Sequence, residues 1–436
     1  MSPGDLLRPK ESGGDATTAQ LVCCGCGLLC DDLSGTTATG CTAADRWFAG
    51  PDRPAAITVD GQPASLDDAL LAAATRLATA RRPLVTGLAS ATLEAVCLAG
   101  QLAEQLAAAV DAGGPETAMA TGPTIARVGE VTAAFEELRD RADLVIFWGC
   151  DPNVSHPRFV ERFVQPPRPT GCRRTISLGP APVLPPAADH LHLPLADDQA
   201  VPAARLLQGM IEGHCSDEVD GPLAAIISQL HAAVEAAACV ALVTSTAADP
   251  SGLTGWSLAQ LVRALAHRKP AFQIPLGAGV AAGGGNLAGV AASCSWRFGA
   301  PGAIVAADRG GSEFAPAEAD AVRLIDRGEV DCVLVVGRLA PRLEAALATA
   351  QTPPMVIHLT DVAPATVHDR AIVLAVARLP HTTSGTMLRE DGRLITLTPR
   401  EPPRQPTLPQ MVSAMVVAIN KVKQEDSPPL SRRSSS

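Results

Sequence analysis

Four cysteines near the N-terminus have the residue type and spacing of a metal site. Cys23, Cys26 and Cys30 are spaced C-x2-C-x3-C within LVCCGCGLLCDDL, and Cys41 follows in TGCTAADRW. Three thiolates on a tight glycine-containing loop and one from downstream can ligate a [4Fe–4S] cluster. Four thiolates also form a tetrahedral zinc site, and free thiols left from a lost site are the third interpretation. The extra thiol of Cys24 weakens both metal interpretations.

Other residues capable of chemistry favour structural roles. His190 and His192 form an H-x-H pair, but no downstream Lys, His and Asp complete an amidohydrolase zinc site, so we expect two histidines on one strand face. Gly277 and Gly279 only partly match a dinucleotide-binding fingerprint. Their loop is expected to let backbone approach closely, either at a cofactor cleft or at another subunit. Cys97 lies on the apolar side of a predicted helix, so we expect it in the core.

The elements that position these residues alternate between short apolar strands and amphipathic helices. This alternation predicts mainly parallel sheets and an α/β fold. The predicted strands lie at residues 83–89, 143–149, 174–179, 239–246 and 331–337. The predicted organisation is a disordered leader (1–19), a Cys-rich segment (20–60), a first α/β unit (61–200), a second α/β unit (201–400) and a C-terminal segment with a disordered tail (401–436).

The composition excludes several classes of protein. The chain has 436 residues, of which 47% are apolar and 18% charged, so it can bury a large core. The net charge of −10 argues against a nucleic-acid partner, because phosphate binding needs a basic surface. The uncharged run at 271–296 is long enough to cross a bilayer but too rich in glycine and polar residues for a lipid-facing helix. We therefore expect a cytoplasmic protein with no membrane partner.

Four segments carry a family resemblance. They are CGCGLLCDDL, DLVIFWGCDPNVSHPRFVERF (143–163), GGGNLAGVAASCSWRFGAP (283–301) and SGTMLREDGRL (384–394). Together they resemble the B subunit of formylmethanofuran dehydrogenase, of the molybdopterin/tungstopterin oxidoreductase family. The longer segments match at Gly149, Cys150, Pro152, Ser155, His156, Pro157, Arg158, Asn286, Gly289, Trp296, Gly299 and Pro301. The resemblance implies a molybdopterin-oxidoreductase-like fold of two doubly wound α/β units with a small Cys-bearing N-terminal segment.

The chain departs from this family at the metal. In the redox enzymes a Cys or selenocysteine bonds the tungsten or molybdenum and a His follows, in a stretch that matches AMATGPT here. Ala120 stands at the metal-ligand position and Thr121 at the His position. A methyl group cannot ligate a metal, and Thr does not exchange protons near neutral pH as His does. We therefore expect no metallopterin. The remnant of the cofactor cleft is expected at Gly122, Pro123, Gly149 and Asn286.

The resemblance also bears on the cysteines. The spacer between Cys30 and Cys41 is shorter than the family usually has. A [4Fe–4S] cluster at Cys23, Cys26, Cys30 and Cys41 therefore stays open as an interpretation, and we favour its loss.

Two functions follow from the resemblance. The first is the redox-active B subunit of a formylmethanofuran dehydrogenase, a tungsten or molybdenum oxidoreductase. The second is a non-redox B subunit of the bacterial formyltransferase/hydrolase complex, which moves formyl between tetrahydromethanopterin and a methanofuran-type carrier and releases formate. In that complex the expected partners are an amidohydrolase-like subunit, a formyltransferase subunit and a third subunit. Ala120 and Thr121 favour the second function, in which this chain is structural and not itself catalytic.

Overall fold

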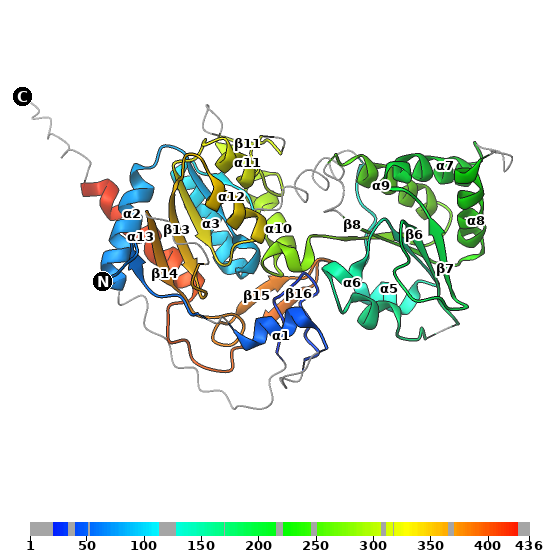
Figure 1. The fold of residues 1–436 in the computed structure, drawn as a ribbon, viewed down its shortest axis with the longest axis horizontal. Coiled ribbons are helices and arrows are strands. Elements are labelled where there is room, and N and C mark those ends of the chain that lie inside the picture. The colour runs from blue at the N-terminus through cyan, green and yellow to red at the C-terminus, as the bar shows by residue number, and fades with distance from the viewer. Residues whose placement is uncertain are drawn as a thin grey trace, which may run out of the picture.

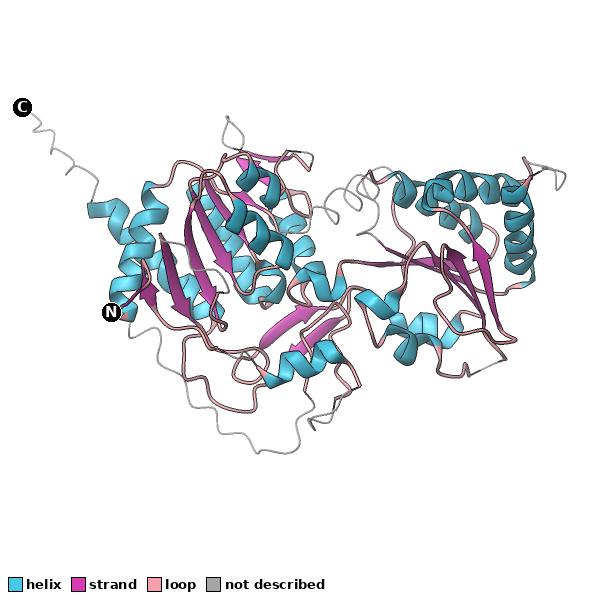
Figure 2. Cartoon of the chain, viewed as in Figure 1, coloured by secondary structure: helices cyan, strands magenta, loops and turns pink. Residues whose placement is uncertain are grey.

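Two sheets with helices on both faces organise the chain in a computed structural model (Figures 1 and 2). A two-stranded hairpin and the Cys-rich segment lie between and below them in the view of Figure 1. The structure describes residues 21–33, 40–50, 53–112, 128–169, 171–214, 221–245, 251–306, 311–316, 318–364 and 370–425.

The larger sheet has nine strands in the order β11-β10-β4-β3-β12-β13-β14-β1-β2. Its five central strands, β4 to β14, are parallel, and the outer strands pair antiparallel. The strands are β1 (Thr58–Val59), β2 (Gln62–Pro63), β3 (Pro83–Thr86), β4 (Ala109–Val110), β10 (Ile304–Ala306), β11 (Ser312–Phe314), β12 (Cys332–Val336), β13 (Met355–Thr360) and β14 (Ala371–Ala375).

Helices cover both faces of this sheet because successive residues of its central strands, which point to opposite faces, are apolar. Leu334 and Ile357 point to one helical layer, and their neighbours Val333 and Val356 point to the other. The first layer contains α2 (Leu66–Thr79), α3 (Leu93–Leu106), α10 (Leu287–Phe298) and α13 (Leu408–Glu425). The second layer contains α11 (Ala321–Asp326) and α12 (Pro341–Thr349).

The smaller sheet has five parallel strands in the order β7-β6-β5-β8-β9. Its strands are β5 (Leu144–Trp148), β6 (Arg174–Gly179), β7 (His190–Pro194), β8 (Val240–Ser245) and β9 (Ala271–Leu276). One face packs on α7 (Ala200–Glu212), α8 (Pro222–Ala236) and α9 (Leu253–Ala266). A 3-10 turn, η4 (Asp197–Gln199), leads into α7.

The other face of the smaller sheet shares its core with the Cys-rich segment. Phe147 and Val243 of the sheet belong to the same apolar cluster as the cysteines and Trp47. The elements in this layer are α1 (Thr42–Ala49), α5 (Phe135–Arg141), α6 (Pro152–Ser155), the π-helical turn η3 (Val160–Val164) and the hairpin β15 (Gly385–Leu388) with β16 (Leu394–Leu397). The Cys-rich segment is therefore an integral part of the core.

The predicted fold class, two doubly wound α/β units with mainly parallel sheets, is confirmed. The distribution of the strands between the two sheets differs from the predicted units 61–200 and 201–400. The boundary at 200 falls between β7 and β8, which are two strands of the same sheet. The larger sheet is built from strands that precede the smaller sheet in the sequence and strands that follow it. Repeated strand–helix units of similar composition carry no local sign of the sheet that each will join.

Two further expectations can be compared with the structure. Cys97 is exposed, so the prediction that it lies in the core is wrong: its side of α3 faces a cavity beside α10. The uncharged run at 271–296 divides into β9, a 3-10 turn (η5, Gly279–Ala282) and α10. Within the described ranges, every helix is too short or too polar to cross a membrane.

Candidate functional site

The carboxyl ends of the parallel strands define where a ligand would bind in each sheet. In open α/β sheets, ligands bind where the strand order reverses direction. This reversal lies between β3 and β12 in the larger sheet and between β5 and β8 in the smaller one. The segment 277–289 contacts residues that follow β3 and β5, so both reversal points meet at one junction.

Side chains from several segments meet at the reversal point of the larger sheet. The backbone N–H of Arg338, just after β12, donates to Ser90 Oγ at 2.6 Å. The Arg338 guanidinium lies 4.0 Å from the centre of the Trp47 ring and 2.6 Å from a carboxylate oxygen of Asp361. The cavity that remains among these residues is about 10 Å³. Among the described residues, this space holds one water molecule at most.

The glycines of segment 277–289 pack against the backbone of the same chain. A Cβ on Gly285 would lie 2.5 Å from the carbonyl oxygen of Cys26, and one on Gly284 would clash with the carbonyl of Ala89. Gly279, at φ +57°, is in similar contact with the Ser155 carbonyl. These glycines therefore join the Cys-rich segment, the end of β3 and α6. The close approach predicted for this loop is internal to the chain.

Asn286 ties three segments together at this junction. Its side chain is fully buried; Nδ2 donates to the Ala91 carbonyl at 2.7 Å, and Oδ1 accepts from Leu388 N at 2.8 Å. Its own backbone N–H donates to the Ala89 carbonyl at 2.8 Å. Both polar groups of the side chain are thus bonded within the chain.

The reversal point of the smaller sheet is more open. Gly149 follows β5 at φ +60°, and a Cβ there would meet nothing within 4 Å. The thiol of the adjacent Cys150 donates to the Val243 carbonyl at 3.2 Å, and burial raises the pKa of this thiol to about 12. Cys150 is therefore a neutral thiol near pH 7. Of the predicted cleft residues, Gly122 and Pro123 lie outside the described residues, as do Ala120 and Thr121 at the family's metal-ligand and His positions.

A buried histidine and a glutamate lie where α6 meets the hairpin. His156 Nε2 is 3.0 Å from Glu390 Oε2, and His156 Nδ1 is 2.9 Å from Ser155 Oγ. Glu390 also accepts from Gly277 N at 3.3 Å, and its backbone N–H donates to Gly27 O at 3.1 Å. Sequence analysis missed Glu390, because a charged residue in a hairpin turn normally indicates solvent exposure.

The cysteines of the N-terminal segment are buried together. Cys23, Cys26, Cys30 and Cys41 each expose 5% or less of their surface. Burial raises the pKa of the first three thiols, and negative charge on their neighbours adds to this effect at Cys23 and Cys26. At Cys30, Arg162 and Arg158 partly offset the rise in pKa. Among the described residues, no three His, Cys, Asp or Glu side chains are grouped closely enough to hold a metal ion.

Cys24, the extra thiol, is fully buried, and burial raises its pKa to about 12. The thiol of Cys24 is therefore neutral near pH 7.

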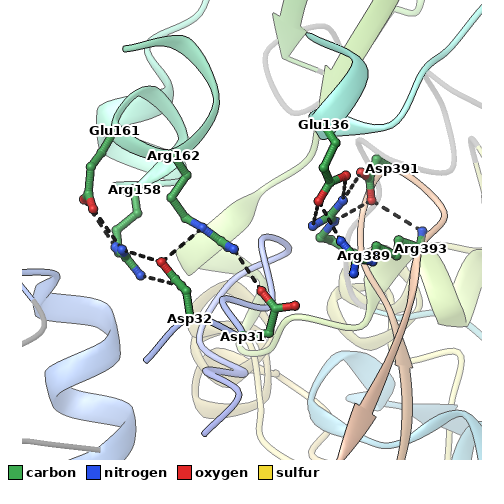
Figure 3. Close-up of polar contacts among 9 residues, drawn as sticks. All are labelled: Asp31, Asp32, Glu136, Arg158, Glu161, Arg162, Arg389, Asp391 and Arg393. Carbon is green, nitrogen blue, oxygen red and sulfur yellow. Dashed lines mark hydrogen bonds and ion pairs between the residues drawn. The ribbon is translucent and has the colours of Figure 1, made fainter. Parts of the chain in front are cut away.

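Ion pairs fasten the Cys-rich segment to the smaller sheet (Figure 3). Arg158 forms a bidentate pair with Asp32 at 2.9 and 2.8 Å and also pairs with Glu161 at 2.8 Å. Arg162 bonds Asp31 at 2.9 Å. We call these five residues the cysteine-segment clamp, since Asp31 and Asp32 directly follow Cys30.

A second set of ion pairs fastens the hairpin to α5 (Figure 3). The fully buried Arg389 lies 2.5 Å from Asp391 and 2.5 Å from Glu136, and its guanidinium is 5.0 Å from the centre of the Phe135 ring. Arg393 adds a contact of 2.7 Å to Glu136. We call the four charged residues the hairpin clamp.

The H-x-H pair has the structural role expected for it. Both histidines are on β7: His190 contacts Thr175 Oγ1 at 2.9 Å and Ser177 Oγ at 3.3 Å, while His192 contacts the Gly179 carbonyl at 3.0 Å. Burial and the neighbouring His192 lower the pKa of His190. The ring nitrogens are engaged with β6, so the pair joins two strands.

Two curated relatives align with part of the chain. The B subunit of the tungsten-containing formylmethanofuran dehydrogenase 2 of Methanococcus maripaludis is 30% identical over 168 residues, covering 34% of this chain and 38% of the relative. Its namesake from Methanocaldococcus jannaschii is 27% identical over 163 residues, covering 33% and 37%. The chain thus matches little more than a third of the length of these relatives. No family model matches it.

A solved structure matches over a longer range. It is a chain in the crystal structure of the formyltransferase/hydrolase complex (FhcABCD) from Methylorubrum extorquens in complex with methylofuran. The TM-score is 0.70 at 22% identity, and the match covers 85% of this chain and 100% of that chain. The predicted resemblance is confirmed. In sequence the chain is similar to the B subunit of formylmethanofuran dehydrogenase, and its fold is that of a chain in the FhcABCD complex.

Proposed function

We propose that this chain is a non-redox B subunit of a cytoplasmic formyltransferase/hydrolase complex in tetrahydromethanopterin- and methanofuran-linked one-carbon metabolism. The observation that carries the proposal is Ala120, which stands where the redox enzymes have a Cys or selenocysteine. A side chain without a lone pair cannot anchor tungsten or molybdenum. The residues therefore do not fit a metallopterin, and the proposed role of the chain is structural.

The junction supports this role. Polar side chains at the junction are bonded to the chain itself: Asn286, a predicted cleft residue, to Ala91 and Leu388, and Arg338 to Asp361. They hold the two sheets, the hairpin and the Cys-rich segment together. The chemistry of the complex then belongs to its proposed partners, which are an amidohydrolase-like subunit, a formyltransferase subunit and a third subunit. The similarity in fold to a chain of FhcABCD supports a hetero-oligomer.

We also propose that the [4Fe–4S] cluster has been lost. Among the described residues, no three potential ligand side chains are grouped closely enough to hold a metal ion, and the cysteine-segment clamp holds the segment through ion pairs. Anaerobically purified protein should be colourless and contain no stoichiometric iron or sulfide. About four irons and four sulfides per chain would overturn this part of the proposal.

Elemental analysis of the native complex tests the main proposal. We expect no stoichiometric tungsten or molybdenum, no viologen reduction with the formyl carrier, and hydrolytic release of formate. Stoichiometric metal together with dye reduction would overturn the proposal and assign the chain to the redox enzymes. An Ala120→Cys complex serves as the control, because it restores the missing thiol while leaving the other subunits unchanged.

A further inference from the structure

A cavity of about 200 Å³ lies on the face of the larger sheet that carries α11 and α12. Its floor consists of apolar side chains of α12, β13 and β14, namely Leu347, Val356, Ala371 and Val373. Each of these residues exposes 7% or less of its surface, so the floor is out of reach of a flat protein surface. An apolar cavity of about 150 Å³ can hold a benzene ring. This cavity therefore has room for a branched aliphatic or a phenyl group.

The cavity follows from the topology of the sheet. The connection from β13 to β14 spans residues 361–370, whereas parallel strands are usually joined by a dozen or more residues that include a helix. Among the described residues, the apolar cluster on this face contains helical side chains from α11 and α12 only, and both helices precede β13. The apolar face of β14 therefore lies beside the last helix of this layer.

Two opposite charges also line the cavity. The exposed Arg53 belongs to the segment before β1, and the half-buried Glu344 lies in the first turn of α12. Within the part of the chain that the structure describes, neither side chain forms an ion pair or a hydrogen bond, although both line the same cavity. Arginine binds a carboxylate through two parallel hydrogen bonds, and a carboxylate binds an ammonium group. The cavity thus offers one unpaired group for each charge of a zwitterion.

We propose that this cavity binds a free α-amino acid with a branched aliphatic or phenyl side chain. The carboxylate of the ligand pairs with Arg53, its ammonium group pairs with Glu344, and its side chain enters the cavity. The other polar side chains in the lining are Thr58 and His358, and His358 Nε2 is already 2.8 Å from the Gly337 carbonyl. A charged side chain would lose its hydration in this cavity with little to replace it. The proposal does not depend on the proposed function, because it involves neither a metallopterin nor another subunit.

Calorimetric titration of the full-length chain with leucine and phenylalanine tests the site. Two analogues separate the charges: 4-methylpentanoate is leucine without its ammonium group, and 3-methylbutylamine is leucine without its carboxylate. Each analogue should bind about tenfold more weakly than leucine, because each loses one charged hydrogen bond. Glutamate should bind more weakly still. No saturation with leucine or phenylalanine up to ~10 mM, or equal affinities for leucine and 4-methylpentanoate, would overturn the proposal.

Substitutions at the two charges assign each contact. Arg53→Gln should weaken leucine binding about tenfold and leave the affinity for 3-methylbutylamine unchanged, whereas Glu344→Gln should weaken leucine binding equally and leave the affinity for 4-methylpentanoate unchanged. Arg263→Gln is the matched control, because Arg263 is an exposed arginine on α9, and it should have no effect. Unchanged leucine affinity in both charge variants, or the same loss for every ligand, would overturn the proposal.

Discussion

The two clamps at the junction use the same chemistry in different surroundings (Figure 3). In the hairpin clamp, Arg389 is fully buried and Asp391 is 1% exposed. In the cysteine-segment clamp, Arg158 is nearly buried, but its partners Asp32 and Glu161 are 41% and 57% exposed. A buried charge that loses its partner cannot regain its hydration, whereas an exposed one can. Similar contact distances therefore correspond to unequal energies.

The largest expected effect comes from Arg389→Met. It leaves the carboxylate of Asp391 buried without its guanidinium, which costs about 3–5 kcal/mol of unfolding free energy. Arg393→Met is the matched control, because Arg393 contacts the same Glu136 from an exposed position; it should cost less than about 1 kcal/mol. Urea unfolding measures both. Equal midpoints for the two variants would show that burial does not set the strength of the pairs within the hairpin clamp.

Arg158→Met should have an intermediate effect. The carboxylates of Asp32 and Glu161 can hydrate when the guanidinium is removed, so the expected loss is about 1–2 kcal/mol. Arg139→Met, which removes an exposed pair with Asp140 within α5, is the control and should be close to neutral. A loss as large as that of Arg389→Met would remove the distinction between the clamps.

Acid should weaken the hairpin clamp through Glu136. Burial alone would raise the pKa of this carboxyl, but the hydrogen bond from Arg389 and the nearby charges outweigh burial and lower the pKa to about 2 from 4.5. A lowered pKa stabilises the folded state above about pH 4.5, and this stabilisation is lost as the pH falls toward 2. Because the group is partly exposed, we expect a loss of about 1 kcal/mol. Unfolding midpoints at several pH values, compared with those of Glu136→Gln, should show a flatter profile for the variant.

Salt should have the smallest effect. Raising the NaCl concentration from about 0.1 M to about 1 M shortens the screening length from ~10 Å to ~3 Å. The stability difference between wild type and Arg158→Met should shrink by a few tenths of a kcal/mol, while the difference for Arg389→Met stays constant. A parallel decrease in both differences would indicate that water reaches both clamps.

Local patterns predicted most of the fold. The strand expected at 174–179 is β6, and the predicted strands at 143–149 and 331–337 each contain the observed strand with one extra residue at either end. β5 and β12 are apolar throughout because both faces are covered, and such runs are easily recognised. The sharing of strands between sheets was not predictable, since it depends on long-range pairing such as that of β3 with β12.

The site was less predictable than the fold. The motif residues Asn286 and His156 do lie at the junction, but their partners come from distant segments. Arg389, an arginine in a hairpin, has no sequence feature that signals complete burial, and its partner Glu136 is 253 residues away. The sequence did not predict the exposure of Cys97. The reason is that an apolar helix face has the same sequence pattern whether or not the rest of the chain covers it.

The placement of the smaller sheet within the sequence of the larger one has a consequence for synthesis. During synthesis, β3 cannot pair with its neighbour β12 until about 250 more residues have been made. The hydrogen bond from Arg81 N to Asp331 joins residues with this separation. At ribosomal rates of ~5–20 residues per second, this delay is roughly 12–50 s. The five strands of the smaller sheet are complete once residue 276 has emerged. Cotranslational folding is therefore expected to proceed from the inside of the sequence outward, with the apolar strand 83–86 exposed to chaperones until the second half of its sheet has been made.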